Sequence, residues 1–210
     1  MNPDLLVEVE RRFAPEIVVG TGVFSTHDRH NVSPLNRGGD KMGPDRHGYA
    51  ATYADVLGRL GGCRVLVELG VFYGSSLAMW DAVLPGVELF GLDLELGRFQ
   101  SNLPKLRERG AFPDRLPTLG EFDAYRPDAA ALEQLLGGRK VDVFVDDGPH
   151  TDEAIVAVAK AVRPLMADRC AYIVEDNRRA ADLIRPFWPD AEVWQAGEMA
   201  VACRLDPSEG

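Results

Sequence analysis

The sequence contains few cysteines and few basic residues relative to acidic ones. Its three cysteines, Cys63, Cys170 and Cys203, are far apart and include no CxxC pair, which argues against a disulfide framework and a thiolate zinc site. Lysine and arginine number 23, against 33 aspartate and glutamate residues, so the formal net charge is −10. Because an acidic chain repels phosphate, we expect neither nucleic acid nor a membrane surface as a partner.

The sequence also lacks long apolar runs. None approaches the roughly 20 residues that a membrane-spanning helix needs. The first residues, MNPDLLVEVERRF, lack the apolar region of a signal peptide. We therefore expect a cytoplasmic protein that acts on small molecules.

Residues 1–60 differ from the rest of the 210-residue chain. Apolar residues at helical spacing predict a helix over residues 4–13, and a second helix is predicted over residues 49–60. Residues 27–48 are polar, contain several glycines and carry three of the four histidines, so we expect a loop that acts as a lid. Residues 61–210 are then expected to form one structural unit around a single large core.

From residue 61 onward, apolar runs that suit strands alternate with segments that suit helices. The predicted strands are residues 63–69, 87–94, part of 115–122, 141–147, 171–176, 191–196 and 199–205, and the predicted helices are 75–83, 128–136, 151–162 and 178–187. Only a short turn at Gly197 separates the last two strands, so they must run antiparallel. The pattern predicts an α/β fold with a doubly wound, seven-stranded sheet that ends in an antiparallel β-hairpin.

A glycine-containing loop, ELGVFYGSS at residues 68–76, follows the first of these predicted strands. Gly70 permits a tight turn, and Gly74 lets the next helix begin close to a ligand. Asp93 ends the second strand, where an acidic residue accepts hydrogen bonds from ribose hydroxyls. The loop lacks the middle glycine of GxGxxG, which a dinucleotide pyrophosphate requires. S-adenosylmethionine carries no phosphate, so the loop favours this cofactor.

Further residues complete the expected cofactor site. Glu68 suits the cationic amino-acid tail of S-adenosylmethionine, and Glu121, after the third strand, is expected to flank the adenine. Ser75, at the start of the next helix, and Tyr49, at the end of the lid, are also expected to bind the cofactor. A nicotinamide-dependent oxidoreductase is the alternative from a different class, and the bulky residues 71–73 argue against it.

Acidic residues follow two strands that we expect to be neighbours in the sheet. These residues are Asp146 and Asp147 in the first pair, and Glu175 and Asp176 in the second. Parallel neighbours lie about 5 Å apart, so carboxylates at their ends repel one another unless a cation lies between them. Oxygen ligands at an open sheet edge suit Mg²⁺, while Ca²⁺ and Mn²⁺ also fit this pattern.

Three segments resemble those of a known enzyme family. They are DGPH at residues 147–150, ED at residues 175–176 and GGDKMGPDRHGYAATY at residues 38–53, in which Gly39 stands where the family usually has threonine. Together they are similar to the metal-dependent sugar O-methyltransferases of the macrocin and mycinamicin type. The resemblance covers most of the chain and implies the class I methyltransferase fold.

The same resemblance implies a reaction and the residues that perform it. Asp147, Glu175 and Asp176 are the implied Mg²⁺ ligands and His150 is the implied general base, while Asp146 is expected to point to the opposite face of its strand. The expected activity is Mg²⁺-dependent methylation of a sugar hydroxyl, on a natural product such as an antibiotic or on its glycosyl precursor. We therefore expect a glycoside as the small-molecule acceptor, and the resemblance also favours a homo-oligomer.

Methylation of a catechol-like phenol is the alternative within the same chemistry. A catechol offers two adjacent oxygens to the metal, and enzymes that methylate it often use lysine as the base. The DGPH segment has His150 at this position, which favours a sugar acceptor.

Overall fold

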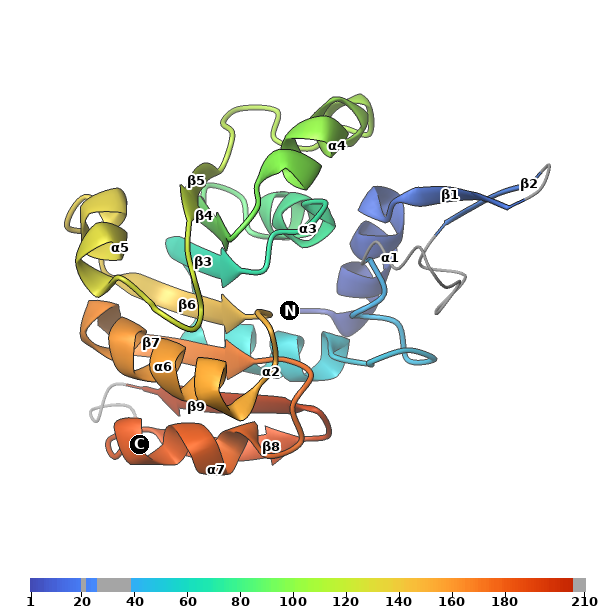
Figure 1. The fold of residues 1–210 in the computed structure, drawn as a ribbon. Helices are drawn as coiled ribbons and strands as arrows, with labels where there is room; N and C mark the ends of the chain where they lie inside the picture. The colour runs from blue at the N-terminus through green and yellow to red at the C-terminus, as the bar shows by residue number, and fades with distance from the viewer. Residues whose placement is uncertain (20–21, 26–38, 206–210) are drawn as a thin grey trace. The chain divides into compact units, whose positions relative to one another are not determined.

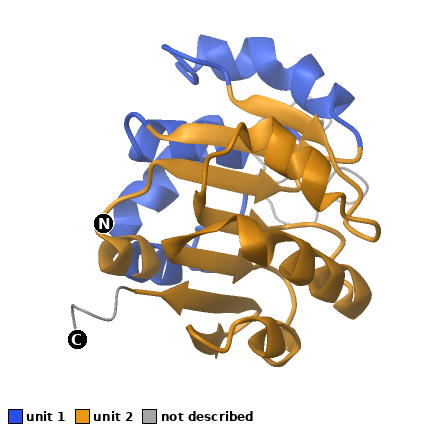
Figure 2. Cartoon of the chain, turned by 90° about the vertical axis from the view of Figure 1, so that its left-hand side faces the viewer, with its two compact units in different colours: residues 1–55, 71–86, 95–116 blue, residues 56–70, 87–94, 117–210 orange. Residues whose placement is uncertain are grey.

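The structure is a computed structural model that describes residues 1–19, 22–25 and 39–205 (Figure 1). The described residues form two compact units, which Figure 2 distinguishes by colour. The first unit comprises residues 1–55, 71–86 and 95–116, and the second comprises residues 56–70, 87–94 and those from 117 onward. No helix in these described ranges has the length and apolarity that a membrane crossing requires.

The second unit contains a seven-stranded sheet. Its strands are β3 (Val65–Leu69), β4 (Glu88–Asp93), β5 (Thr118–Glu121), β6 (Val141–Asp146), β7 (Met166–Val174), β8 (Glu192–Ala196) and β9 (Met199–Arg204), in the spatial order β5-β4-β3-β6-β7-β9-β8. The pairs from β5 to β7 are parallel, whereas β9 runs antiparallel to both β7 and β8. This topology confirms the predicted doubly wound sheet and its terminal hairpin.

Three helices cover one face of this sheet (Figure 1). They are α5 (Ala129–Leu136), α6 (Asp152–Val162) and α7 (Ala180–Ile184), and short 3₁₀ turns at Arg163–Leu165 and Arg185–Phe187 follow the last two. The apolar faces of these helices pack against alternate residues of the strands and form one core with them. Leu132, Val158 and Ile184 are helix residues in this core. Thr151 caps α6 by accepting a hydrogen bond from the backbone N–H of Ala154 at 3.3 Å, and this cap fixes where the helix begins.

The first unit is mainly helical. It contains α1 (Pro3–Phe13), α3 (Ser75–Val83), α4 (Gly97–Glu108) and an antiparallel pair formed by β1 (Glu16–Val19) and β2 (Gly22–Ser25). Helix α1 packs against α3, and α2 (Ala50–Leu60) begins in this unit and ends in the second. The division of the chain near residue 60 stays a prediction.

Three of these elements were not predicted from the sequence: helix α4 and the strands β1 and β2, which precede residue 63. The segment GRFQSNLPKLRE of α4 is polar and contains Pro104, and its buried residues are Phe99 and Leu106, too few to give a helical apolar stripe. Strand β7 also begins at Met166 rather than at the predicted residue 171. The sequence did not indicate this start, because residues 167–169 are partly buried or exposed and interrupt the apolar run.

A buried carboxylate joins α1 to the segment that follows the undescribed loop. Glu10 is 2% exposed and accepts hydrogen bonds from the backbone N–H groups of Lys41 at 2.7 Å and Met42 at 3.0 Å. We expect Glu10→Ala to lower the free energy of unfolding by roughly 1–3 kcal/mol, because it leaves these buried donors without their acceptor. Urea unfolding followed by circular dichroism measures this loss.

Glu8→Ala is the matched control, because Glu8 lies on the same helix and is exposed. The control is expected to change the free energy of unfolding by less than about 0.5 kcal/mol. Equal losses in the two variants would contradict the role given to the Glu10 carboxylate.

Candidate functional site

The carboxyl ends of the parallel strands bring predicted site residues of the second unit to one edge of its sheet (Figure 1). Asp93, the last residue of β4, lies opposite Glu121, the last residue of β5. Leu69, the last residue of β3, lies opposite Asp146, which precedes Asp147. Doubly wound sheets bind their ligands at this edge, so the candidate site is built on it.

The loops that leave β3 and β6 approach each other backbone to backbone. Gly70 has φ +95°, and a Cβ atom at this position would lie only 2.0 Å from the carbonyl oxygen of Asp147. The N–H of Gly70 donates to the carbonyl of Leu92 at 2.8 Å, and the N–H of Asp147 donates to that of Leu69 at 2.9 Å. Glycine is therefore required where the predicted cofactor loop meets the predicted metal ligand.

Glu68 lies within β3, just before this turn. It is fully buried, and its register neighbours are Gly91 on β4 and Val145 on β6. A cationic group stabilises a buried carboxylate because it compensates the carboxylate's charge. Glu68 therefore fits the predicted contact with a cationic amino-acid tail.

Three side chains from the ends of β6 and β7 converge. One ligand atom each of Asp147, His150 and Asp176 lie within 4.8 Å of one another. The His150 Nε2 atom lies 3.9 Å from the Asp147 Oδ1 atom. Two carboxylates and an imidazole nitrogen at this spacing form a donor set that a divalent cation accepts. The predicted ligands Asp147 and Asp176 and the predicted base His150 are thus brought together.

His150 presents its ring in a half-buried position. Its side chain is 35% exposed, and its Nδ1 atom is buried without a hydrogen-bond partner among the described residues. Its backbone has φ +57°, a left-handed conformation that is uncommon for histidine. The ring is thus held at the sheet edge by an unusual backbone, with one nitrogen toward Asp147.

Glu175, the third predicted ligand, lies outside this group of three. It is 1% exposed, and its backbone N–H donates to the carbonyl of Asp146 at 3.0 Å. The structure therefore brings Asp147 and Asp176 together and does not add Glu175 to them, and a metal-binding role for Glu175 stays a prediction.

Asp146 is directed into the core. Its Oδ2 atom accepts a hydrogen bond from the Tyr172 hydroxyl at 2.6 Å, and its Oδ1 atom accepts one from the N–H of Gly148 at 3.3 Å. Burial raises the pKa of Asp146 to about 6, although both hydrogen bonds oppose this rise. Burial, reinforced by the neighbouring Asp146, also raises the pKa of Tyr172 well above its ordinary value. Asp146 thus fixes the backbone that carries Asp147.

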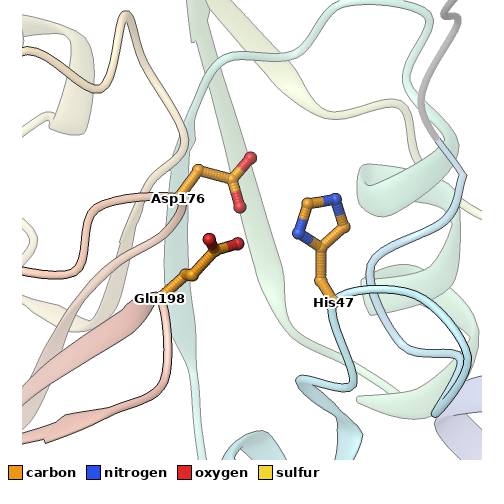
Figure 3. Close-up of side chains that lie close together, drawn as sticks. All are labelled: His47, Asp176 and Glu198. Carbon is orange, nitrogen blue, oxygen red and sulfur yellow. The ribbon is translucent and has the colours of Figure 1, made fainter. Parts of the chain in front are cut away.

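Glu198, which lies between β8 and β9, was not predicted as a site residue from the sequence. A carboxylate oxygen of Glu198 lies within 4.8 Å of one of Asp176, and Figure 3 shows these two carboxylates close together. Glu198 also forms an ion pair with Arg178 at 2.9 Å. Its position could have been predicted from the terminal hairpin, because an antiparallel β9 beside β7 brings the turn before β9 to the edge where β7 ends.

The remaining predicted cofactor residues belong to the first unit. Ser75 is 5% exposed in the first turn of α3, and its Oγ atom has no hydrogen-bond partner among the described residues. Tyr49 is 3% exposed, its N–H donates to the carbonyl of Lys41 at 3.1 Å, and its ring lies 5.3 Å from that of His47. Of the predicted lid over residues 27–48, residues 27–38 lie outside the described part of the chain.

Comparison with solved structures reveals similar folds. MycE, a methyltransferase from the mycinamycin biosynthetic pathway, was solved with Mg and SAH; it is 16% identical, with a TM-score of 0.58, and the match covers 81% of this chain and 53% of MycE. A second MycE structure, with mycinamycin VI also bound, gives a TM-score of 0.59. A Klebsiella pneumoniae protein described as an O-methyltransferase is 13% identical, with a TM-score of 0.56 and coverage of 96% of this chain and 89% of that one.

These similarities establish the fold. The chain has the class I methyltransferase fold, as the three segments at residues 38–53, 147–150 and 175–176 implied. It spans about half the length of MycE. No protein-family model matches the sequence, and no curated protein matches it either.

Proposed function

We propose that this protein is an S-adenosylmethionine-dependent O-methyltransferase that requires Mg²⁺ and acts on a sugar hydroxyl. The observation that carries the proposal is the convergence of Asp147, His150 and Asp176 at the sheet edge, beside the loop that turns at Gly70. A metal-binding group next to a ribose-binding edge suits the transfer of a methyl group to an oxygen.

The donor is proposed to lie along the ends of β3, β4 and β5. Asp93 accepts hydrogen bonds from the ribose hydroxyls, Glu121 flanks the adenine, and the buried Glu68 compensates the cationic amino group. Ser75 and Tyr49 stay predicted cofactor contacts. The fully buried carboxylate of Glu68 and the glycine-only turn at Gly70 support a close approach of the amino-acid end of the donor.

The proposed mechanism uses Asp147, Glu175 and Asp176 to hold Mg²⁺ and His150 to accept the proton of the acceptor hydroxyl. When bound there, Mg²⁺ supplies a positive charge that lowers the pKa of a hydroxyl and fixes its position. The imidazole of histidine is the side chain that most often accepts a proton in general base catalysis. The sheet edge orients the resulting nucleophile toward the donor, and orientation of this kind supplies much of the acceleration.

A sugar is the proposed acceptor, on a natural product such as an antibiotic or on its glycosyl precursor. Two observations support it: the DGPH and ED segments resemble sugar O-methyltransferases, and the similar MycE was solved with mycinamycin VI. A catechol-like phenol is the contrasting acceptor for the test below. A homo-oligomeric state and a cytoplasmic location stay predictions.

A binding and turnover experiment tests the proposal. S-adenosylmethionine near 100 times its Kd is expected to raise the Tm by roughly 5–10 °C, because ligand that binds only the native state adds about 2.7 kcal/mol of stability, and NAD is expected to have no effect. Methyl transfer to a panel of rhamnosides and macrolide glycosides, read by mass spectrometry, is expected to stop in EDTA and to recover with added Mg²⁺.

The controls separate the alternatives. A Tm that rises with NAD instead of S-adenosylmethionine would replace the methyltransferase with an oxidoreductase. Turnover that persists in EDTA would remove the metal from the mechanism. Methylation of catechol, with no glycoside methylated, would keep the chemistry and change the acceptor class.

A further inference from the structure

Two residues of the converging group have a left-handed backbone without being glycine. His150 and Asp176 both have φ +57°. An L-residue adopts this conformation at a cost in free energy, and it persists only where the surrounding structure fixes it. The segments on either side of these residues should therefore contain the groups that impose it.

The side chain amide of Asn177 connects the segments that carry these two residues. Asn177 directly follows Asp176, and its Nδ2 atom donates to the carbonyl of His150 at 3.0 Å and to Asp152 Oδ1 at 3.2 Å. Its Oδ1 atom accepts from the N–H of Arg179 at 2.8 Å, and its own N–H donates to the carbonyl of Glu198 at 2.8 Å. Asn177 thus links the loop after β6, the loop after β7 and the turn before β9.

A second amide fixes Asn177 from the side of β8. The Nε2 atom of Gln195 lies 3.0 Å from each of three carbonyl oxygens, those of Asn177, Gly197 and Met199. Its Oε1 atom accepts from the N–H of Ala181 at 3.0 Å. The peptide groups on both sides of Asn177 are therefore held, one by Glu198 and the other by Gln195.

We infer that Asn177 and Gln195 are positioning residues for the site, because they impose the left-handed backbone that brings His150 and Asp176 toward Asp147. The inference rests on the proposed function for its catalytic consequence, but the hydrogen bonds that carry it are independent of that function. Neither residue belongs to the group of three. Asn177 acts through the backbone carbonyl of His150, and Gln195 acts through the backbone of Asn177, which directly follows Asp176.

Asn177→Ala and Gln195→Met test the inference, because each removes the amide without adding charge. Loss of an amide that orders a ligand is expected to raise the Kd for Mn²⁺, measured by electron paramagnetic resonance as a probe of the Mg²⁺ site, by roughly 10–100-fold. We expect kcat to fall by a similar factor and the KM for S-adenosylmethionine to change little, because the donor lies on other strands. A purely structural role would lower the Tm of the variants and leave their Kd for Mn²⁺ and their kcat at the wild-type values.

Hydrogen exchange, read by mass spectrometry, tests the same inference without metal or turnover. Exchange in peptides that contain residues 147–152 and 174–179 is expected to rise about 10-fold in both variants, because each loses hydrogen bonds of the network, while the α5 peptide stays unchanged. Gln134→Met, on the exposed surface of α5, is the control substitution. It is expected to match the wild type in Mn²⁺ binding, in turnover and in hydrogen exchange.

The outcomes separate the two proposals. If the wild type binds Mn²⁺ and transfers methyl groups but the variants match it, the positioning role is wrong and the proposed function stands. If the wild type does neither, the proposed function fails, and the exchange rates alone decide the positioning role: unchanged rates in the variants overturn it.

Discussion

Gly70→Ala is expected to lower the rate of methyl transfer by roughly 100-fold and to destabilise the protein by roughly 2–5 kcal/mol. The added Cβ would lie 2.0 Å from the carbonyl oxygen of Asp147, so one of the two loops has to move. Alanine also meets a penalty of about 1–2 kcal/mol at φ +95°. Displacing this backbone shifts both the cofactor loop and Asp147, and a misplacement of about 1 Å in an active site costs roughly 100-fold in rate.

Gly138→Ala is the control that distinguishes the steric clash with Asp147 from the cost of placing alanine at a positive φ. Gly138 has φ +80°, and a Cβ atom there meets nothing within 4 Å. This control is expected to lose only about 1–2 kcal/mol and to keep its activity. Urea unfolding and calorimetric binding of SAH measure both effects. If the two variants lose the same stability and both bind SAH, the contact between Gly70 and Asp147 is not as close as described.

His150→Asn is expected to lower kcat by about 10²–10⁴-fold, the range that a general base contributes. Asparagine is chosen because it tolerates the left-handed backbone at φ +57°, so the surrounding loop should keep its conformation. Binding of SAH and of Mn²⁺ is expected to stay at the wild-type level. Single-turnover methyl transfer from S-adenosylmethionine measures the chemical step.

Chemical rescue provides the matched comparison for this substitution. In His150→Gly the left-handed backbone is unstrained and the ring is absent, so added imidazole is expected to restore part of the rate. A variant that loses Mn²⁺ binding together with turnover would make His150 a ligand rather than a base. Wild-type turnover in His150→Asn would remove it from the chemistry.

Strands buried on both faces were predictable from the sequence because burial leaves a continuous apolar run. The segment CRVLVEL contains β3, all five residues of which are buried, and the segment VDVFVDD contains β6. The order of strands and helices then fixed the doubly wound topology. Helix α4 was not predictable in this way, because few of its residues are buried and Pro104 interrupts the pattern.

The candidate site was predictable at the level of strand ends and not at the level of side chains. Parallel neighbours place their carboxyl ends together, so Asp147 and Asp176 were expected to be close. Which of two successive acidic residues joins the group depends on the backbone conformation of that turn. The value φ +57° at Asp176 is imposed by contacts distant in sequence, such as that of Gln195 with Asn177. The residues next to Asp176 in the sequence therefore do not predict it.

The position of β9 has a consequence for the order in which the protein is assembled. Residues 199–204 pair with β7 on one side and with β8 on the other, so β9 is an interior strand that follows both of its neighbours in the chain. Until residue 204 has left the ribosome, the growing chain carries β7 with an open edge and β8 without its partner. Such an unpaired edge is a place where nascent chains associate with one another. Completion of this sheet therefore waits for the synthesis of β9, after both of its neighbours have been made.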